Sequence, residues 1–453
     1  MAQVAKELDG YLSDFERFEK NGAAKGPSWV HEIRRAALSR FAELGFPTAR
    51  HPDPELREEW KYTSVAPIVG LRFKPADHEL SWPASDALAS ATLGSVACAE
   101  LVFVNGRYSP ALSSRRSLPK RVAALSLPAA LNAHPESIEP HLARHASSQN
   151  HPFVALNTAF MRDGAFVYVP TGTVVEAPIH LLFISTGRGH PTVSYPRNLI
   201  VAGRDSQVTI VERYIGLQND AYFTNAVTEV VVGENAAIDH YKLQREGEDA
   251  FHIATLQVHQ GRSSNFSSHS VALGGALVRN DVNAVLDGEG SECTLNGLYM
   301  VTGQQHVDNH TRIDHVKPHC LSRQLYKGVL DGKARGVFNG KIVVHPAAQK
   351  TDARQTNKNL LLSGDALIDT KPQLEINNND VKCTHGSTIG RLDEDSIFYL
   401  RSRGIGVEVA RGLLTYAFAS EIIKRIKVEP IRAQLENLLV RRLRSGLPVE
   451  DTP

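Results

Sequence analysis

The alternation of apolar and polar residues changes character twice along the chain. In the first part, Trp29, Ile33 and Phe41 recur at helical spacing after Ser28. A Gly-Phe-Pro stop follows this run, so the pattern predicts a helix over residues 28–44.

The rest of the first part mixes strand and helix signals. Residues 51–64 combine prolines with dense charge, which predicts an irregular link. The apolar run 101–104 is followed by Asn105-Gly106, a pair that suits a left-handed turn, so a small hairpin should close on 107–108. Residues 119–160 return to a helical composition interrupted by prolines.

From about residue 160 to 390, short β-branched runs are separated by a glycine and a polar residue. The turn glycines recur every 27 to 31 residues, at Gly172, Gly203, Gly233, Gly261 and Gly288. This period indicates a repeat architecture, and units without an intervening helix favour a β-helix. A large antiparallel sandwich or double jelly roll gives the same short strands and stays open as an alternative.

After residues 393–395 the pattern becomes helical again. Pro430 suits a first-turn position, and one apolar stripe follows it at Ile431, Leu435, Leu438 and Leu439. The preceding segment 409–428 is apolar over much of its circumference, more than packing on one end of a solenoid requires. One of its faces is therefore expected to meet a partner.

Composition and charge exclude several classes of protein. Lys plus Arg total 50 and Asp plus Glu 49, a net charge of +1, which argues against nucleic acid as a partner. No apolar run of about 18 residues is present to span a membrane, and the N-terminus lacks the apolar stretch of a secretory signal. These features predict a cytosolic protein.

The four cysteines Cys98, Cys293, Cys320 and Cys383 are far apart and form no CxxC pair. This spacing argues against a disulfide framework and against a self-contained ferredoxin-type cluster. The sequence also has no GxxxxGK[ST] phosphate loop. Metal ligands and nucleotide hydrolysis would therefore have to come in part from other chains.

The densest polar segment contains His306, Asp308, His310, Asp314, His315, His319 and Cys320. His306, Asp308 and His310 alternate along a strand and should share one face, where imidazole and carboxylate suit iron or zinc. The alternative is a structural role, with polar side chains in ladders on a solenoid surface.

A second segment places Cys383 two residues before His385, so on a strand both side chains project from one face. A thiolate beside an imidazole can form half of a cluster site, and Asp380 and Asp393 add carboxylates nearby. Gly386 leaves space for a neighbouring chain. A buried structural cysteine is the main alternative, and a cysteine hydrolase ranks last.

At this segment the sequence resembles the SufB/SufD family. The stretch KPQLEINNNDVKCTHGSTIGRLDEDSIFYLRSRGI follows the family's C-terminal signature almost continuously, and the similarity extends back through residues 310–363 to EEWKYT and LVFVNGRYSPALS. SufB-like members carry a CEHEA type sequence and a cysteine in an FYC segment. This chain has Cys383-Thr384-His385-Gly386-Ser387 and Phe398-Tyr399-Leu400, which resembles the SufD-like members.

The resemblance implies a mainly β fold: a right-handed parallel β-helix over residues 159–394, between a mostly helical N-terminal region with a small hairpin, 1–158, and a C-terminal helical region, 395–453. It also implies a non-enzymatic scaffold for iron–sulfur cluster assembly that pairs with SufB and binds the ATPase SufC through the C-terminal helices. The isolated chain could form a homodimer.

The resemblance further implies a transient iron–sulfur cluster shared with SufB, and no cofactor held tightly by the chain alone. His385 matches the histidine at that junction and is the stronger ligand candidate, and Cys383 is the weaker one. The segment from His306 to His319 then becomes mostly structural. The competing hypothesis is a metal-dependent, cupin-like enzyme that uses that segment.

Overall fold

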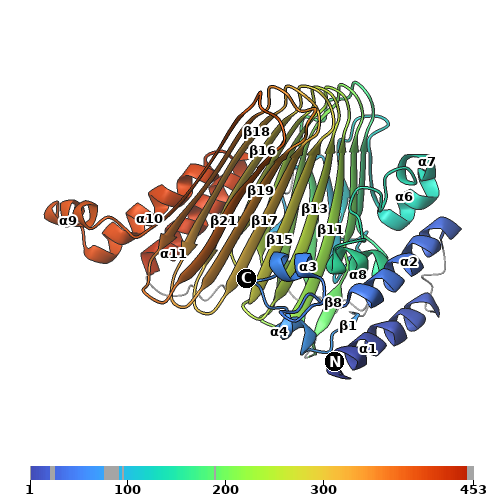
Figure 1. Cartoon of the computed structure of the whole chain (residues 1–453), viewed down its shortest axis with the longest axis horizontal. Coiled ribbons are helices and arrows are strands. Elements are labelled where there is room, and N and C mark those ends of the chain that lie inside the picture. The colour runs from blue at the N-terminus through green and yellow to red at the C-terminus, as the bar shows by residue number, and fades with distance from the viewer. Residues whose placement is uncertain (1, 21–25, 76–90, 94–95, 188–189, 446–453) are drawn as a thin grey trace.

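The computed structural model describes residues 2–20, 26–75, 91–93, 96–187 and 190–445. Its centre is a parallel β-solenoid, in which each coil places one strand in each of two facing sheets (Figure 1). Strands of consecutive coils pair in parallel within each sheet. The expected β-helix is therefore confirmed, and the antiparallel sandwich is excluded.

We call the two sheets sheet A and sheet B. In spatial order, sheet A contains β21 (Leu367–Ile376), β19 (Arg335–Val344), β17 (His306–His315), β15 (Leu277–Leu286), β13 (Phe251–Gln260), β11 (Tyr222–Val232), β9 (Arg197–Ala202), β6 (Ala165–Val169) and β5 (Ala123–Ser126), with β8 (Thr192–Ser194) and β1 (Lys74–Pro75) beside β11. Sheet B contains β22 (Lys382–Gly390), β20 (Asp352–Leu361), β18 (Leu321–Leu330), β16 (Glu292–Val301), β14 (Asn265–Ala272), β12 (Ala237–Arg245), β10 (Gln207–Gly216), β7 (Ile179–Ser185), β2 (Ala99–Val104) and β3 (Arg107–Tyr108), with β4 (Ser114–Arg115) on β2.

The turn glycines allow successive coils to approach closely. The backbone N–H of Gly233 donates to the carbonyl of Ala202, 2.8 Å away, and the N–H of Gly261 donates to Val232 in the same way. A Cβ added to Gly288 would lie 2.0 Å from the backbone nitrogen of Arg262, closer than any side chain tolerates. The predicted glycine period therefore marks the turn at which adjacent coils stack.

The interior between the sheets holds the main hydrophobic core. Leu181, Ile210, Ile238 and Val230 point into it from both sheets and are almost completely buried. Because side chains alternate along a strand, the intervening residues face outward and meet the helices.

The N-terminal helices cover the outer face of sheet A. They are α1 (Ala2–Phe18), α2 (Ser28–Leu44), α3 (Pro54–Glu59), α4 (Ala66–Val69), α6 (Leu127–Ala133), α7 (Pro135–Ile138) and α8 (Pro152–Phe160). Phe41 and Phe160 from α2 and α8 pack with the outward-facing Phe223 and Phe251 of β11 and β13. Helix α2 has the bounds expected from the sequence.

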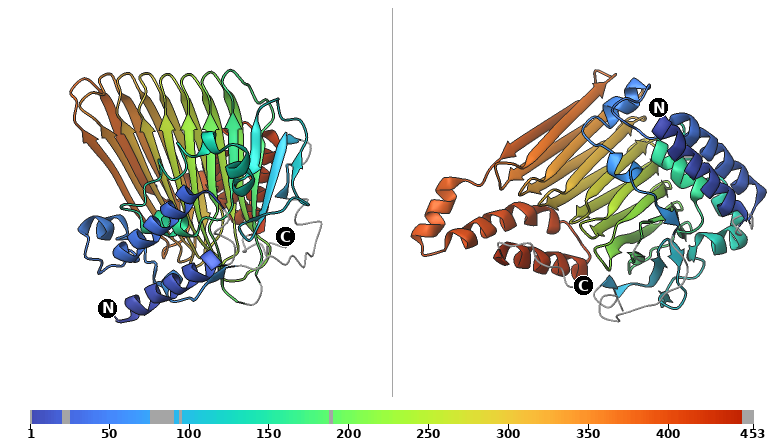
Figure 2. Two further views of the ribbon diagram at one scale, coloured as in Figure 1. Left: turned by 90° about the vertical axis from the view of Figure 1, so that its right-hand side faces the viewer. Right: turned by 90° about the horizontal axis from the view of Figure 1, so that it is seen from below.

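Of the C-terminal helices, α10 (Val407–Ile423) and α11 (Glu429–Ser445) pack on the outer face of sheet B, on the opposite side of the solenoid (Figure 2). Helix α9 (Glu394–Ser402) precedes them and projects beyond the solenoid. Ile431, Leu435 and Leu439 of the predicted stripe are buried against Tyr241 and Leu298 of sheet B. In the described part of the chain, no helix combines the length and apolarity that a membrane crossing requires.

Two predictions for the first part of the chain have different outcomes in the structure. The hairpin is confirmed: β2 and β3 pair antiparallel through Asn105 and Gly106, both with positive φ. The irregular link is wrong in part, because residues 54–59 form α3, with the Asp53 carboxylate capping its first turn. Since β2 also pairs in parallel with β7, the hairpin belongs to sheet B, and the division at residue 158 stays a prediction.

Candidate functional site

The last coil of the solenoid forms an open end. Strands β21 and β22 pair with the preceding strands β19 and β20 on one side only. Leu367, Ile376 and Ile389 on these two strands are exposed by 60%, 43% and 51%. Long exposed edges with apolar side chains are sites where a further strand can add to a sheet.

Cys383 and His385 lie on β22 and face the same side, as expected. Their register partners on β20 are Ala353 and Gln355, which are buried inside the solenoid, whereas the intervening Arg354 is exposed. Both positions therefore continue the inward-facing side of sheet B onto the open end.

The two side chains have different surroundings. Cys383 is half-buried against a small apolar cluster that includes Ile342 and Val344, and burial raises the pKa of its thiol. His385 is exposed. A Cβ on the adjacent Gly386 would meet no atom within 4 Å, so the space beside His385 is open.

The two nearby carboxylates have structural partners. Asp380 pairs with Lys350 at 2.8 Å, and Asp393 caps α9 by accepting the backbone N–H of Ser396 at 3.0 Å. Among the described residues, no group of three or more His, Cys, Asp or Glu side chains is arranged to hold a metal ion. At the open end, this chain therefore offers a thiol and an imidazole.

Beside the apolar cluster, part of the interior below the open end is polar and hydrogen-bonded across the two sheets. The Thr370 hydroxyl on β21 donates to the side-chain oxygen of Asn357 on β20 at 2.9 Å and lies 2.9 Å from the Ser387 hydroxyl on β22. Asn359 donates to the same Asn357 oxygen at 2.6 Å. These bonds fasten both strands of the last coil to the coil beneath.

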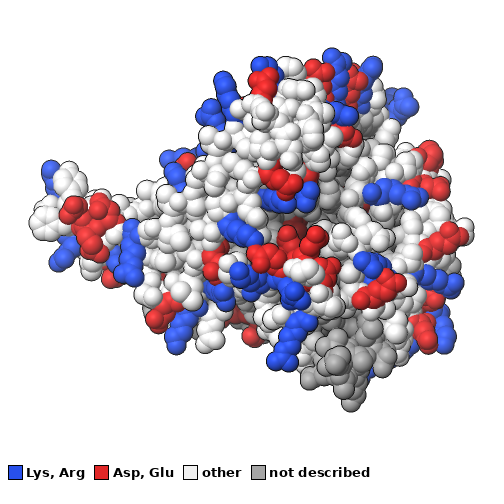
Figure 3. All heavy atoms as spheres, viewed as in Figure 1, with Lys and Arg blue, Asp and Glu red and all other residues white. Residues whose placement is uncertain are grey.

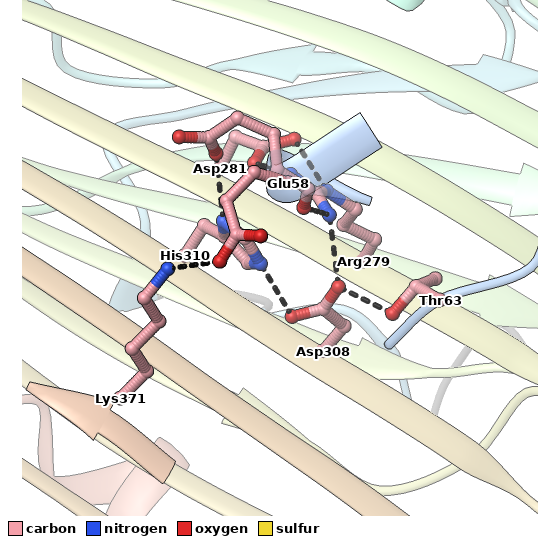
Figure 4. Close-up of polar contacts among 8 residues, drawn as sticks. Glu58, Thr63, Arg279, Asp281, Asp308, His310 and Lys371 are labelled. Atoms are coloured by element: carbon pink, nitrogen blue, oxygen red, sulfur yellow. Dashed lines mark hydrogen bonds and ion pairs between the residues drawn. The ribbon is translucent and has the colours of Figure 1, made fainter. Parts of the chain in front are cut away.

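Residues 306–315 of the histidine-rich segment form β17, and His306, Asp308 and His310 share its outer face, as predicted. They contact residues 58–63, a stretch that we call the 58–63 clamp (Figure 4). The Thr63 hydroxyl donates to Asp308 at 2.5 Å and lies 2.9 Å from the His306 ring. Glu59 lies 3.2 Å from the His310 ring.

Arg279 completes this network from the neighbouring strand β15. Its guanidinium pairs with Asp281 and Asp308, each at 2.9 Å, and stacks 3.7 Å from the centre of the Trp60 ring. Lys371 of the last coil pairs with Glu58 (Figure 4). The surface over this region alternates acidic and basic residues (Figure 3).

The charges in this network shift one another's pKa. Burial and the nearby Arg279 lower the pKa of His310, but Asp308 and Glu59 outweigh them and raise it to about 8. The hydrogen bond from His310 is the largest cause that lowers the pKa of Glu59 to about 2. Burial raises the pKa of Asp308, yet His310 and Arg279 hold it well below its usual range.

The other members of the segment also have partners within the chain. His315 points inward, 2.9 Å from the Ser322 hydroxyl, and Asp314 pairs with Arg312 at 2.7 Å. The thiol of Cys320 is buried and donates to the Gly288 carbonyl at 3.3 Å. His319 lies in a turn. These contacts are consistent with a structural role of the segment within the solenoid.

Two family models together match nearly the whole chain. The model of the N-terminal region of SufBD proteins matches residues 5–181, and the SufBD core domain of the SUF system for iron–sulfur cluster assembly matches residues 183–418. The chain belongs to the SufBD family. It is thus an iron–sulfur cluster assembly protein, and most strands of its solenoid lie within the matched core domain of this family.

Full-length relatives refine this assignment within the SufBD family. The iron–sulfur cluster assembly protein SufD of Escherichia coli is 34% identical over 95% of this chain and 96% of its own length. A SufBD family protein of Synechocystis is 37% identical over 89% and 88%, and SufD of Bacillus subtilis is 27% identical over 96% and 97%. The similarity supports a SufD-type member, as the sequence at residues 383–387 predicted.

The C-terminal helices expose an apolar face away from the solenoid. Phe398 and Tyr399 of α9 are exposed by 72% and 57%, and Val409 and Leu413 of α10 by 57% and 46%. Figure 1 shows that α9 is the C-terminal helix farthest from the solenoid. Ile422 and Ile423 at the other end of α10, within the segment expected to meet a partner, are completely buried against sheet B instead.

Proposed function

We propose that this chain is a non-enzymatic scaffold subunit that joins SufB at the open end of its solenoid and carries SufC on α9 and α10. The observation that carries the proposal is the last coil, whose unpaired β21 and β22 edges surround the inward-facing Cys383 and His385. A partner that adds strands to these edges would cover both side chains.

In this role the iron–sulfur cluster is cargo. The chain supplies the His385 imidazole and, as a weaker candidate, the half-buried Cys383 thiol, and SufB supplies the remaining ligands. No cofactor stays tightly bound to the isolated chain, and assembly takes place in the cytosol. Without SufB, the same edges are available to a second copy, which would give a homodimer.

SufC is assigned to the exposed apolar face of α9 and α10. Apolar side chains gather there on helices that extend beyond the solenoid, and an aromatic pair, Phe398 and Tyr399, offers the kind of anchor that interfaces favour. A protein with its own nucleotide site must join the assembly if hydrolysis drives it, because the phosphate-loop motif is missing from this sequence.

The ligand role is tested with His385→Ala in the complex with SufB and SufC. Iron, sulfide and visible absorption should fall relative to the wild-type complex, and Cys383→Ser should have the smaller effect. Thr384→Ala is the matched control, because Thr384 lies between them on β22 and faces outward. An intact His385→Ala complex that loads the cluster normally would refute the ligand role.

Pairing with SufB is tested at the edges. Ile389→Lys and Leu367→Lys place charges on the exposed parts of β22 and β21 and should prevent co-purification of SufB with the folded chain. Retained SufB in both variants would mean that pairing uses another surface.

SufC docking is tested with Leu413→Asp, which should abolish SufC capture without unfolding the chain, since Leu413 is 46% exposed. Lys424→Asp introduces the same side chain at an exposed position just after α10, about three helical turns (~16 Å) from Leu413 and next to sheet B, and should leave capture intact. Equal capture by both variants would contradict the assignment.

A further inference from the structure

A column of amide side chains runs through the solenoid toward His385. Gln324 on β18, Gln355 on β20 and His385 on β22 are successive register partners, so their side chains stack on the inward-facing side of sheet B. Gln324 and Gln355 are exposed by 4% and 1%. His385 is thus the last residue of an interior column.

The hydrogen bonds in this column share one direction. The Gln324 amide nitrogen donates to the Thr311 hydroxyl at 2.6 Å, and the Gln355 amide nitrogen donates to the Gln324 side-chain oxygen at 2.8 Å. Each amide therefore donates to a residue earlier in the solenoid, Gln324 across the interior to β17 and Gln355 to the coil below, and presents its oxygen to the next donor. Chains of this kind polarise one another and strengthen each bond.

Beneath His385, the hydrogen-bonded part of the column ends at the Gln355 side-chain oxygen, an acceptor that receives no hydrogen bond from the part of the chain that the structure describes. The Gln355 side-chain oxygen has no hydrogen-bond partner among the described residues, although the residue is almost completely buried. Its amide is held in place, because it packs where a Cβ on Gly340 of sheet A would lie 2.1 Å from its nitrogen. A fixed, buried acceptor without a donor is unfavourable unless a donor reaches it.

We propose that Gln355 is a positioning residue for His385: its side-chain oxygen accepts the N–H of the imidazole when SufB covers the open end. The bond fixes which ring nitrogen carries the proton and turns the other nitrogen toward the partner as a metal ligand. This inference rests on the proposed ligand role of His385. It adds a residue that itself touches neither cluster nor partner.

The test uses Gln355→Met, which keeps the length of the side chain and removes the acceptor. Gln324→Met is the matched control, since it makes the same change one coil below and leaves the Gln355 oxygen in place. Gln355→Glu retains an acceptor and should restore the wild-type behaviour in part. Thermal unfolding of each variant verifies that the solenoid remains folded.

The first measurement is the protonation pattern of His385 in the cluster-free complex. The chain is labelled with 15N-histidine, assembled with unlabelled SufB and SufC, and examined by solid-state NMR, with His385→Ala identifying the resonances. One tautomer should dominate in the wild type and in Gln324→Met. In Gln355→Met the ratio of the two tautomers should fall about fivefold, the loss that one hydrogen bond implies.

The second measurement is cluster retention against an iron chelator, which should weaken about tenfold in Gln355→Met and remain unchanged in Gln324→Met. Identical tautomer ratios in Gln355→Met and Gln324→Met would overturn the inference, whatever His385→Ala does. If instead the ratio shifts but His385→Ala loads the cluster normally, the contact stands and the ligand role of His385 fails.

Discussion

Removing the charge of Asp308 should detach the 58–63 clamp from the solenoid. Asp308 is 1% exposed, accepts the Thr63 hydroxyl, and pairs with Arg279 at 2.9 Å and His310 at 3.0 Å. Breaking a buried ion pair by removing one partner costs about 3–5 kcal/mol. Because Arg279 keeps Asp281, we expect the lower end for Asp308→Asn, about 3 kcal/mol.

The loss is measured by denaturant unfolding together with hydrogen exchange of residues 54–63. A change of about 3 kcal/mol raises the open population of the clamp by more than about 100-fold. Asp314→Asn is the control on the same face of β17. Its partners Arg312 and His345 are 49% and 42% exposed, so it should cost at most about 1 kcal/mol. Equal losses in the two variants would refute the reasoning.

The same network makes the clamp sensitive to pH. The pKa of His310 is raised from 6.5 to about 8, so its contribution is complete below pH 6.5 and is lost as the pH rises through 8. The pKa of Glu59 is lowered from 4.5 to about 2, so its contribution is present above pH 4.5 and is lost as the pH falls through 2. Attachment should therefore be strongest between pH 4.5 and 6.5.

Three further outcomes follow from contacts described above. Exchange of the 54–63 amides, corrected for intrinsic rates, should rise between pH 6.5 and 9, and His310→Gln should remove this rise. Gly288→Ala should lower the unfolding free energy by about 1–3 kcal/mol, whereas Gly364→Ala, with no atom within 4 Å of its Cβ, should not. Thr370→Val should speed amide exchange in β22 and leave β12 unchanged, because it breaks the bond that ties the last coil to Asn357.

The sequence predicted the elements that depend on local chemistry. The helix over residues 28–44 and the Asn105-Gly106 turn are specified by spacing and by residue conformation, and both are confirmed. The glycine period predicted the coil length, since the register advances by 30 residues from Gln207 to Ala237. The choice of a β-helix over a sandwich came from the family resemblance, because both folds use short strands and glycine turns.

The contacts of the candidate clusters were not predictable from spacing. His306, Asp308 and His310 share a face as expected, but their partners Thr63 and Glu59 precede them by more than 240 residues. The pattern over residues 51–64 indicated an irregular link because this stretch is held by contacts with distant residues of β17, which a local pattern does not reveal. Asp53 followed by Pro54 was the local signal for α3 that the density of proline and charge concealed.

The apolar circumference of α10 shows the same limit. Its composition indicated that more of the helix surface is apolar than packing on the solenoid requires. The composition alone did not identify the residues that contact sheet B. The structure buries Ile422 and Ile423 and leaves Val409 and Leu413 exposed. Which of these residues are buried depends on which part of α10 contacts sheet B.

The residues of the His385 column give a physical reason why the open end can stay folded without the partner proposed for it. At the start of the His385 column, the inward-facing residues are Ile179 and Ile210, and at its end they are Gln324 and Gln355. A wholly apolar interior at the last coil would expose more of the core to water or to nonspecific association. Hydrogen-bonded amides remain compatible with water in the absence of the proposed partner SufB. The same polarity provides a fixed acceptor beneath His385, so the stability of the open end and the orientation of the proposed ligand have a common physical origin.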